Sequence, residues 1–160
     1  MDLTVRAAGV RDVPALVELR VANAEAHVLL DPDTYRIPDR AAVADHFAAV
    51  LAGGRDAVFV AERADGRVVG MVEVLLRTEP PAHQILRPEP SAEVHTVVLP
   101  DVRGGGVGAA LLAAARRWAA DRGVTYLGAG IHHANAGAVR FYTRHGFTTA
   151  GVRLTSRLAH

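Results

Sequence analysis

Residues 93–108 read EVHTVVLPDVRGGGVG, a strand pattern that passes through a glycine-rich turn into a helix. The first seven of these residues are rich in β-branched side chains, which favour a strand over 93–99. The first turn of a helix has N–H groups without intrahelical partners and a positive dipole end, and glycine lets an anion approach the backbone closely. The order of strand, glycine turn and helix therefore predicts an anion site at 103–108.

Two common phosphate-binding loops do not match this stretch. A Walker A loop requires Gly-Lys-Ser/Thr, and no such sequence follows. A Rossmann fingerprint requires glycines after the first strand of a βαβ unit and an acidic residue about 20 positions later. Gly104, Gly106 and Gly108 do not have that spacing, and they come late in the chain. On its own, the loop is equally typical of an anion site and of a turn that simply enters a helix.

The helix that follows the glycines has the clearest pattern in the chain. Val107, Leu111 and Ala115 recur at helical spacing over 106–122, with charged residues on the other side, and Gly123 ends the pattern.

The rest of the chain predicts one mixed α/β domain over residues 1–160, because no linker or repeat divides it. A helix is expected to begin at Asp12, with Asp12 as its N-cap and Pro14 in its first turn. The turn around Gly66 predicts a β-hairpin, and two proline-containing segments, 31–38 and 78–91, predict loops. Further strands are expected at 3–7, 57–61, 67–75, 124–131 and 147–158, and further helices at 12–30, 39–51 and 135–145.

Composition excludes several classes of function. Half of the 160 residues are apolar, which is enough to bury a core. The chain has no Cys, which excludes disulfides, thiolate metal sites and Cys nucleophiles. The net charge of +1 gives no reason to expect nucleic-acid binding. No apolar stretch approaches the roughly 20 residues of a membrane span, and the N-terminus has no signal-peptide pattern, so a soluble cytoplasmic protein is expected.

Two blocks of the chain resemble the GNAT superfamily of acetyltransferases. Arg103, Gly106 and Gly108 match the family's Arg/Gln-x-x-Gly-x-Gly/Ala motif between a strand and a helix. The second block contains Asn135 and Tyr142, seven residues apart, and then Gly146-Phe147. The order of elements is similar over almost the whole chain. The resemblance implies a single GNAT-like domain with a central, mixed and mostly antiparallel sheet flanked by helices on both faces.

The resemblance also implies acetyl-CoA as the acyl donor, with no metal. Backbone N–H groups of the loop would hold the pyrophosphate, and the preceding strand, splayed from its neighbour, would pair with the pantetheine arm. Asn135 would bond the pantetheine region, and Tyr142 would lie near the cofactor sulfur and protonate the leaving thiolate. The implied strand and loop contacts are Thr96, Val97, Val98, Arg103, Gly104, Gly105, Gly106, Val107, Gly108 and Ala109.

Glu93 and His95 are the candidate general bases. They alternate on the strand before the loop, so both side chains are expected on one face of the sheet. The family often uses a Glu on this strand, and an imidazole ordinarily titrates near neutral pH. Some relatives place a Glu five residues before the Asn, where this chain has Gly130. His132 or His133 is the remaining alternative for that position.

The acceptor is expected to be a primary amine of a small molecule or a peptide. The loops at 30–39 and 78–91 should border its pocket, and four residues are expected to attract a cationic amine: Asp31, Asp33, Tyr35 and Glu73. No nucleic-acid or membrane partner is expected. The family often dimerises through its C-terminal strands, which implies a homodimer through 147–158, although the arginines of that segment are equally typical of a strand edge protected by charge.

Two other functions fit the same motifs. A non-catalytic acyl-CoA-binding or sensory domain would keep the loop but would need neither Tyr142 nor a base. A nucleotide-binding module would use the same helix N-terminus.

Overall fold

The computed structural model describes residues 2–159, and the chain divides into two compact units, Met1–Gly130 and Ile131–His160. The first unit contains a five-stranded sheet of order β1-β2-β3-β4-β5. All neighbouring strands are antiparallel except β4 and β5, which are parallel. This arrangement confirms the expected mixed, mostly antiparallel sheet. The strands are β1 (Leu3–Ala7), β2 (Ala57–Arg63), β3 (Val68–Leu76), β4 (Ser91–Val98) and β5 (Tyr126–Gly128).

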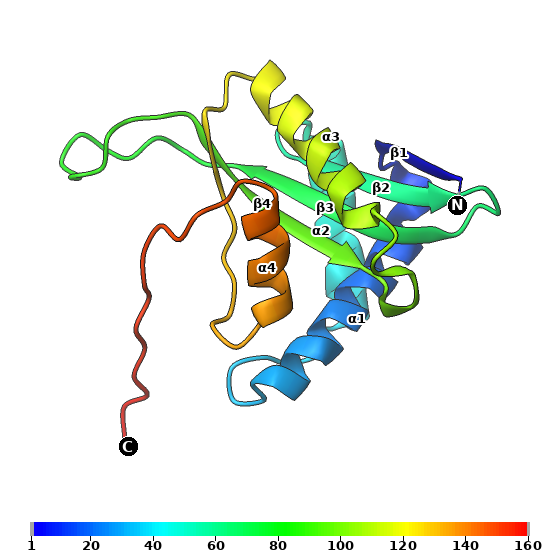
Figure 1. Cartoon of the computed structure of the whole chain (residues 1–160), viewed down its shortest axis with the longest axis horizontal. Helices are drawn as coiled ribbons and strands as arrows, with labels where there is room; N and C mark the ends of the chain where they lie inside the picture. The colour runs from blue at the N-terminus through cyan, green and yellow to red at the C-terminus, as the bar shows by residue number, and fades with distance from the viewer. Residues whose placement is uncertain (1, 160) are drawn as a thin grey trace. The chain divides into compact units, whose positions relative to one another are not determined.

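Helices cover both faces of this sheet, as predicted (Figure 1). The helices α1 (Val13–Leu30) and α2 (Arg40–Gly53) pack on one face, where Phe47 belongs to a core cluster with Met71 and Val97. The helix α3 (Val107–Asp121) packs on the other face. It lies so close to β3 that a Cβ at Gly70 would come within 3.0 Å of the Leu111 side chain. Glycine is required there by space.

The β2–β3 hairpin forms as its turn sequence predicts. The Arg63 N–H donates to the Arg67 carbonyl, and Gly66 has a φ of +86°, a value that glycine adopts without strain. Strand β3 is almost entirely buried, which explains its nearly continuous apolar run. Glu73 is the one charged residue in that run.

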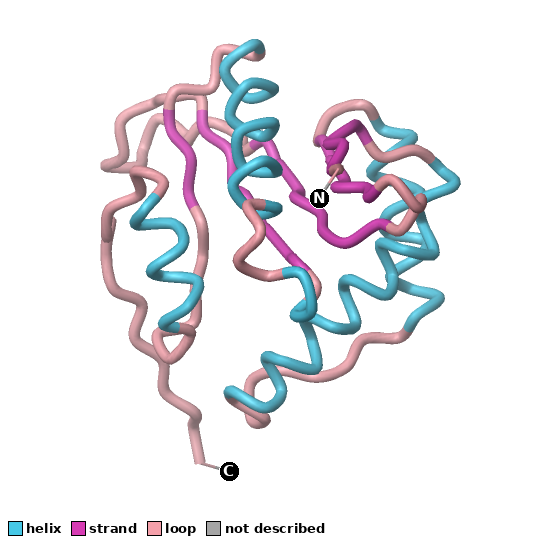
Figure 2. Tube along the Cα trace, turned by 45° about the vertical axis from the view of Figure 1, so that its right-hand side comes forward, coloured by secondary structure: helices cyan, strands magenta, loops and turns pink. Residues whose placement is uncertain are grey.

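The second unit contains α4 (Ala136–Arg144), followed by a segment without regular structure (Figure 2). The predicted final strand at 147–158 is therefore wrong. Its alternating apolar side chains Val152, Leu154 and Leu158 are more than 80% exposed. Alternation favours a strand only where a neighbouring strand supplies backbone hydrogen bonds, and no strand among the described residues pairs with this segment. The strand predicted at 124–131 is also shorter than expected, because β5 covers only Tyr126–Gly128.

The start of α1 differs from its prediction in one respect. Asp12 occupies the N-cap position, but its side chain does not cap α1. Its carboxylate instead accepts the Gly9 N–H at 2.7 Å and two bonds from the Arg6 guanidinium at 2.8 and 2.9 Å. Arg6 also bonds Glu62 on β2, so this network joins the sheet to the helix. The Arg6 guanidinium, despite the opposing effect of burial, holds the pKa of Asp12 below its usual range.

Replacing Asp12 with alanine should lower the free energy of unfolding by about 2 kcal/mol at pH 7, because Gly9 loses its buried acceptor and Arg6 keeps only Glu62. A carboxyl whose pKa is lowered by folding stabilises the protein above its unfolded pKa of about 3.9, and this stabilisation is lost as the pH falls through the folded value. The difference between wild type and variant should therefore shrink on acidification. Urea unfolding at pH 7 and pH 3 measures it.

The matched control is Glu18→Gln, which removes an exposed partner of Arg40. This variant should unfold at the same urea concentration as wild type. An equal midpoint for Asp12→Ala would show that the buried network does not stabilise the fold.

Candidate functional site

Strand β5 pairs only with the start of β4. The two strands pair at Ser91–Tyr126, Ala92–Leu127 and Glu93–Gly128, where the ladder ends. On the other side of β4, the Leu99 N–H donates to the Val69 carbonyl at 2.9 Å. Because backbone groups alternate along a strand, those of Val94, Thr96 and Val98 are directed to the edge that β5 leaves.

The direction of the main-chain groups distinguishes Val97 from Thr96 and Val98, the other two predicted strand contacts. Thr96 and Val98 direct their main-chain groups to the edge beyond the β4–β5 ladder. The main chain of Val97 is directed to β3, and its side chain lies in the core cluster under α1 and α2. Val97 therefore supports the strand by packing, a distinction that alternation alone could have suggested.

After β4, a 3-10 turn (Pro100–Val102) and the glycine loop (103–106) lead into α3. Gly104 and Gly106 have φ values of +85° and +81°, and open space surrounds both positions, so backbone conformation rather than crowding requires glycine. Gly106 is the N-cap of α3, and the first intrahelical bond runs from the Ala110 N–H to the Gly106 carbonyl at 3.0 Å. The N–H groups of 107–109 precede that bond and have no acceptor within the helix. Unpartnered N–H groups at the positive end of a helix are suited to bind an anion.

The loop is held from two sides. The Arg103 Nε donates to the Val98 carbonyl at 3.2 Å, which ties the loop to the last residue of β4. The Arg67 guanidinium on the β2–β3 turn bonds Asp101 at 2.8 and 3.4 Å. The same hydrogen bonding lowers the pKa of Asp101, so this carboxylate is charged at neutral pH.

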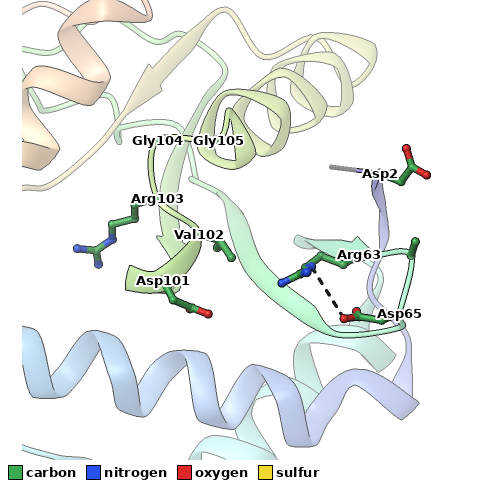
Figure 3. Close-up of a pocket in the computed structure, with 9 residues that line it drawn as sticks. Asp2, Arg63, Asp65, Asp101, Val102, Arg103, Gly104 and Gly105 are labelled. Carbon is green, nitrogen blue, oxygen red and sulfur yellow. Dashed lines mark ion pairs between the residues drawn. The ribbon is translucent and has the colours of Figure 1, made fainter.

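A pocket of about 700 Å³ lies on the flank of the loop that faces the β2–β3 turn (Figure 3). Three carboxylates line it, and Figure 3 shows the Arg103 side chain directed away from Asp101 and Asp65. Two of the three carboxylates are paired with arginines, Asp65 with Arg63 and Asp101 with Arg67, so the pocket offers a phosphate no concentrated positive charge. An anion is therefore expected at the α3 N-terminus rather than in this pocket. The full lining is Asp2, Arg63, Ala64, Asp65, Asp101, Val102, Arg103, Gly104 and Gly105.

Glu93 and His95 share the face of the sheet that α1 and α2 cover. His95 lies opposite Glu73, and Val97, two residues further on, lies opposite Met71 in the core of that face. The prediction of a common face is confirmed. His95 is exposed, whereas the Glu93 side chain is 17% exposed and pairs with the Arg77 guanidinium at 2.7 Å.

Glu73 has partners that the sequence did not reveal. Its buried carboxylate bonds the Arg20 guanidinium on α1 and lies 3.7 Å from the His46 Nε2 on α2. The expected attraction of a cationic amine to Glu73 is therefore weakened by a charge that already compensates it. Arg20 is 53 positions away in the chain, so only packing brings the pair together. Asp31, Asp33 and Tyr35 lie in the segment between α1 and α2, where the Tyr35 ring packs edge-on against His27.

The second unit holds the other predicted residues. The Asn135 Oδ1 caps α4 by accepting the Ala138 N–H at 3.2 Å. Tyr142 follows two helical turns later, so the seven-residue spacing places both on the same side of α4. Tyr142 is 7% exposed, and its ring packs edge-on against Phe141 and Phe147.

His132 and His133, the alternatives for the missing Glu, stack on each other with ring centroids 4.5 Å apart. The His132 Nδ1 accepts the Ala134 N–H at 3.1 Å. No group of three or more His, Asp or Glu side chains that could hold a metal ion occurs within 2–159. No helix of the described chain is long and apolar enough to cross a bilayer.

Comparison with known proteins gives one family match. Residues 22–147 match the model of the acetyltransferase (GNAT) family. A mycothiol acetyltransferase of Saccharomonospora viridis is 37% identical over 95 residues, which are 59% of this chain and 30% of that protein. An aminoglycoside N(6')-acetyltransferase type 1 of Stenotrophomonas maltophilia is 42% identical over 77 residues, 46% of this chain and 47% of that protein. The chain thus spans less than half the length of these two relatives.

Solved structures share the fold at lower identity. A tetramutant of the BH1408 protein from Bacillus halodurans superposes with a TM-score of 0.87 at 21% identity, over 97% of this chain and 99% of the other. The aminoglycoside N-acetyltransferase AAC(6')-Iy in complex with CoA superposes with a TM-score of 0.74 at 21% identity, over 98% and 95% of the two chains. At such identities the likeness shows the fold alone.

Proposed function

The chain belongs to the GNAT family of acetyltransferases, and we propose that it transfers the acetyl group of acetyl-CoA to a primary amine of a small molecule or peptide, by direct attack in a ternary complex. The match over residues 22–147 confirms the family predicted from the two motifs. One observation carries the proposal: the edge of β4 beyond its ladder with β5 leads, through the turn at 99–106, to the α3 N-terminus. An extended amide chain joined to a pyrophosphate suits this combination, because its amides can pair with the strand edge while the anion meets the helix N-terminus.

The donor is proposed to bind along this line. The pantetheine amides pair with the backbone of Thr96 and with the N–H of Val98, whose carbonyl accepts the Arg103 Nε. The pyrophosphate accepts hydrogen bonds from the N–H groups of the loop and of residues 107–109. Asn135, whose Oδ1 caps α4, retains its amide N–H donors for the pantetheine region.

The proposed reaction forms one bond and breaks one. The lone pair of a neutral amine attacks the thioester carbon, and backbone N–H groups near Val98 stabilise the oxyanion. Glu93 or His95 accepts the proton that the nitrogen loses. The C–S bond then breaks, Tyr142 donates its phenolic proton to the thiolate, and solvent returns a proton from the base to the phenolate.

The acceptor is proposed only as an amine. The two curated relatives are named for mycothiol and aminoglycoside acetylation, and each aligns over less than half of its length. On the face of the sheet under α1 and α2, the carboxylates of Glu73 and Glu93 are each paired with an arginine. An acceptor screen with acetyl-CoA, read as thiol release, therefore tests the function directly.

The same screen separates the alternatives. Thiol release with an amine supports the enzyme. Calorimetric binding of CoA without thiol release from any amine would favour the acyl-CoA-binding or sensory domain. Binding of ATP or NAD as tight as that of CoA would favour the nucleotide-binding module.

Replacing Gly106 with alanine should weaken acetyl-CoA binding about tenfold. The φ of +81° costs a side chain roughly 1–2 kcal/mol, so the variant is expected to relax the turn and move the N–H groups that hold the pyrophosphate. Calorimetric titration measures the Kd. Gly53→Ala is the control, because Gly53 has equally open surroundings without a positive φ. Unchanged affinity in Gly106→Ala would remove the loop from the donor site.

A further inference from the structure

A pair of glycines lies directly under the Glu93 carboxylate. A Cβ at Gly128 would come within 3.1 Å of the Glu93 Oε2, and a Cβ at Gly130 would come within 3.4 Å of its Oε1. Neither glycine has a positive φ, so the backbone conformation does not require glycine at either position. The absence of side chains instead leaves room for the carboxylate to lie across the segment 128–130.

Arg77 holds this carboxylate by one of its two oxygens. Its Nε and Nη2 donate to Oε2 of Glu93 at 3.1 and 2.7 Å. Within residues 2–159, Oε1 receives no hydrogen bond. The Arg77 residue is itself anchored, because its N–H donates to the Ser91 carbonyl at the start of β4.

The held carboxylate lies where β4 and β5 separate, because Glu93–Gly128 is the last pair of the ladder. Resting on the proposed function, we propose that Arg77 is a positioning residue, which fixes Glu93 over Gly128 and Gly130 with Oε1 left to receive the acceptor amine. The guanidinium also compensates the charge of Glu93. Without Arg77, the uncompensated carboxylate would stabilise the ammonium form of the acceptor. Less of the neutral, reactive amine would then be present in the site.

Arg77→Ala should lower kcat about tenfold without raising the KM for the acceptor or for acetyl-CoA. Arg77→Lys, which retains one charged donor, should recover part of this loss. Arg55→Ala is the control, because Arg55 lies at the same end of the sheet and bonds the Leu76 carbonyl rather than Glu93. Gly128→Ala places a methyl group against the Glu93 carboxylate and should displace it, so this variant should show the same loss in kcat.

Two further measurements decide the proposal. In a Glu93→Gln background, Arg77→Ala should have no additional effect, because both residues act through one carboxylate. Fully additive effects, or kcat equal to that of Arg55→Ala, would overturn the positioning role.

Crystal structures of wild type and Arg77→Ala provide a test that does not need turnover. The Glu93 carboxylate should lie over Gly128 and Gly130 in wild type and leave them in the variant. If it stays in place without Arg77, the proposal is wrong even for an active enzyme. If no amine is acetylated by wild type, the proposed function fails, and the structures still decide whether Arg77 holds Glu93.

Discussion

Tyr142→Phe should lower kcat about a hundredfold and leave the Kd for acetyl-CoA within about twofold of wild type. The variant loses the phenolic proton that the departing thiolate is proposed to take, while it keeps the ring that packs against Phe141 and Phe147. An effect confined to the chemical step is the kinetic pattern of a group that acts in the transition state. Steady-state kinetics with calorimetry separates the two quantities.

Tyr126→Phe is the matched control, because Tyr126 is half-exposed on β5 and also loses only a hydroxyl. It should keep the wild-type kcat. A Tyr142→Phe enzyme with unchanged kcat would withdraw the acid role from Tyr142. A melting temperature measured for each variant shows whether loss of the hydroxyl also affects folding.

The general base should be identified by comparing Glu93→Gln with His95→Gln. Removing the true base is expected to lower kcat/KM about a hundredfold or more, because the amine then loses its proton without a positioned acceptor. The profile of kcat/KM against pH should also lose its acidic limb in that variant alone. Both side chains lie on the face under α1 and α2, so each variant serves as the control for the other.

Two outcomes would change the assignment. If both variants keep the acidic limb, neither residue is the base, and His132 and His133 become the next pair to replace. If Glu93→Gln alone loses the acidic limb, Glu93 is the base. That result would also support the positioning role of Arg77, which bonds this carboxylate.

Elements with a strong local pattern were predicted accurately. The helix after the glycines was expected at 106–122 and forms at Val107–Asp121, and the first strand forms at Leu3–Ala7 as expected. These elements are specified by residues only a few positions apart: the periodic apolar side chains and the positive-φ glycines Gly66 and Gly106. The first of the two motifs that indicated the family, Arg103 to Gly108, adjoins this helix.

Elements that depend on a distant partner were predicted less well. The segment 147–158 has the alternation of a strand, but no strand pairs with it among the described residues, and β5 ends after three residues at Gly128. Alternation reports which side chains could share a face, and it does not report whether a neighbour exists to complete the ladder.

The glycine turn and the helix that follows it are local structure, because they are adjacent in the chain, so the sequence alone predicted them. The environment of each acidic side chain was not predicted. Arg77 meets Glu93 across the β3–β4 pairing, and Arg20 reaches Glu73 from α1. Gly128 is the last residue of β5, and Gly130 lies just after it. Charge pairing and carboxylate orientation depend on distances of a few ångströms between residues far apart in the chain, so only the packed fold could determine them.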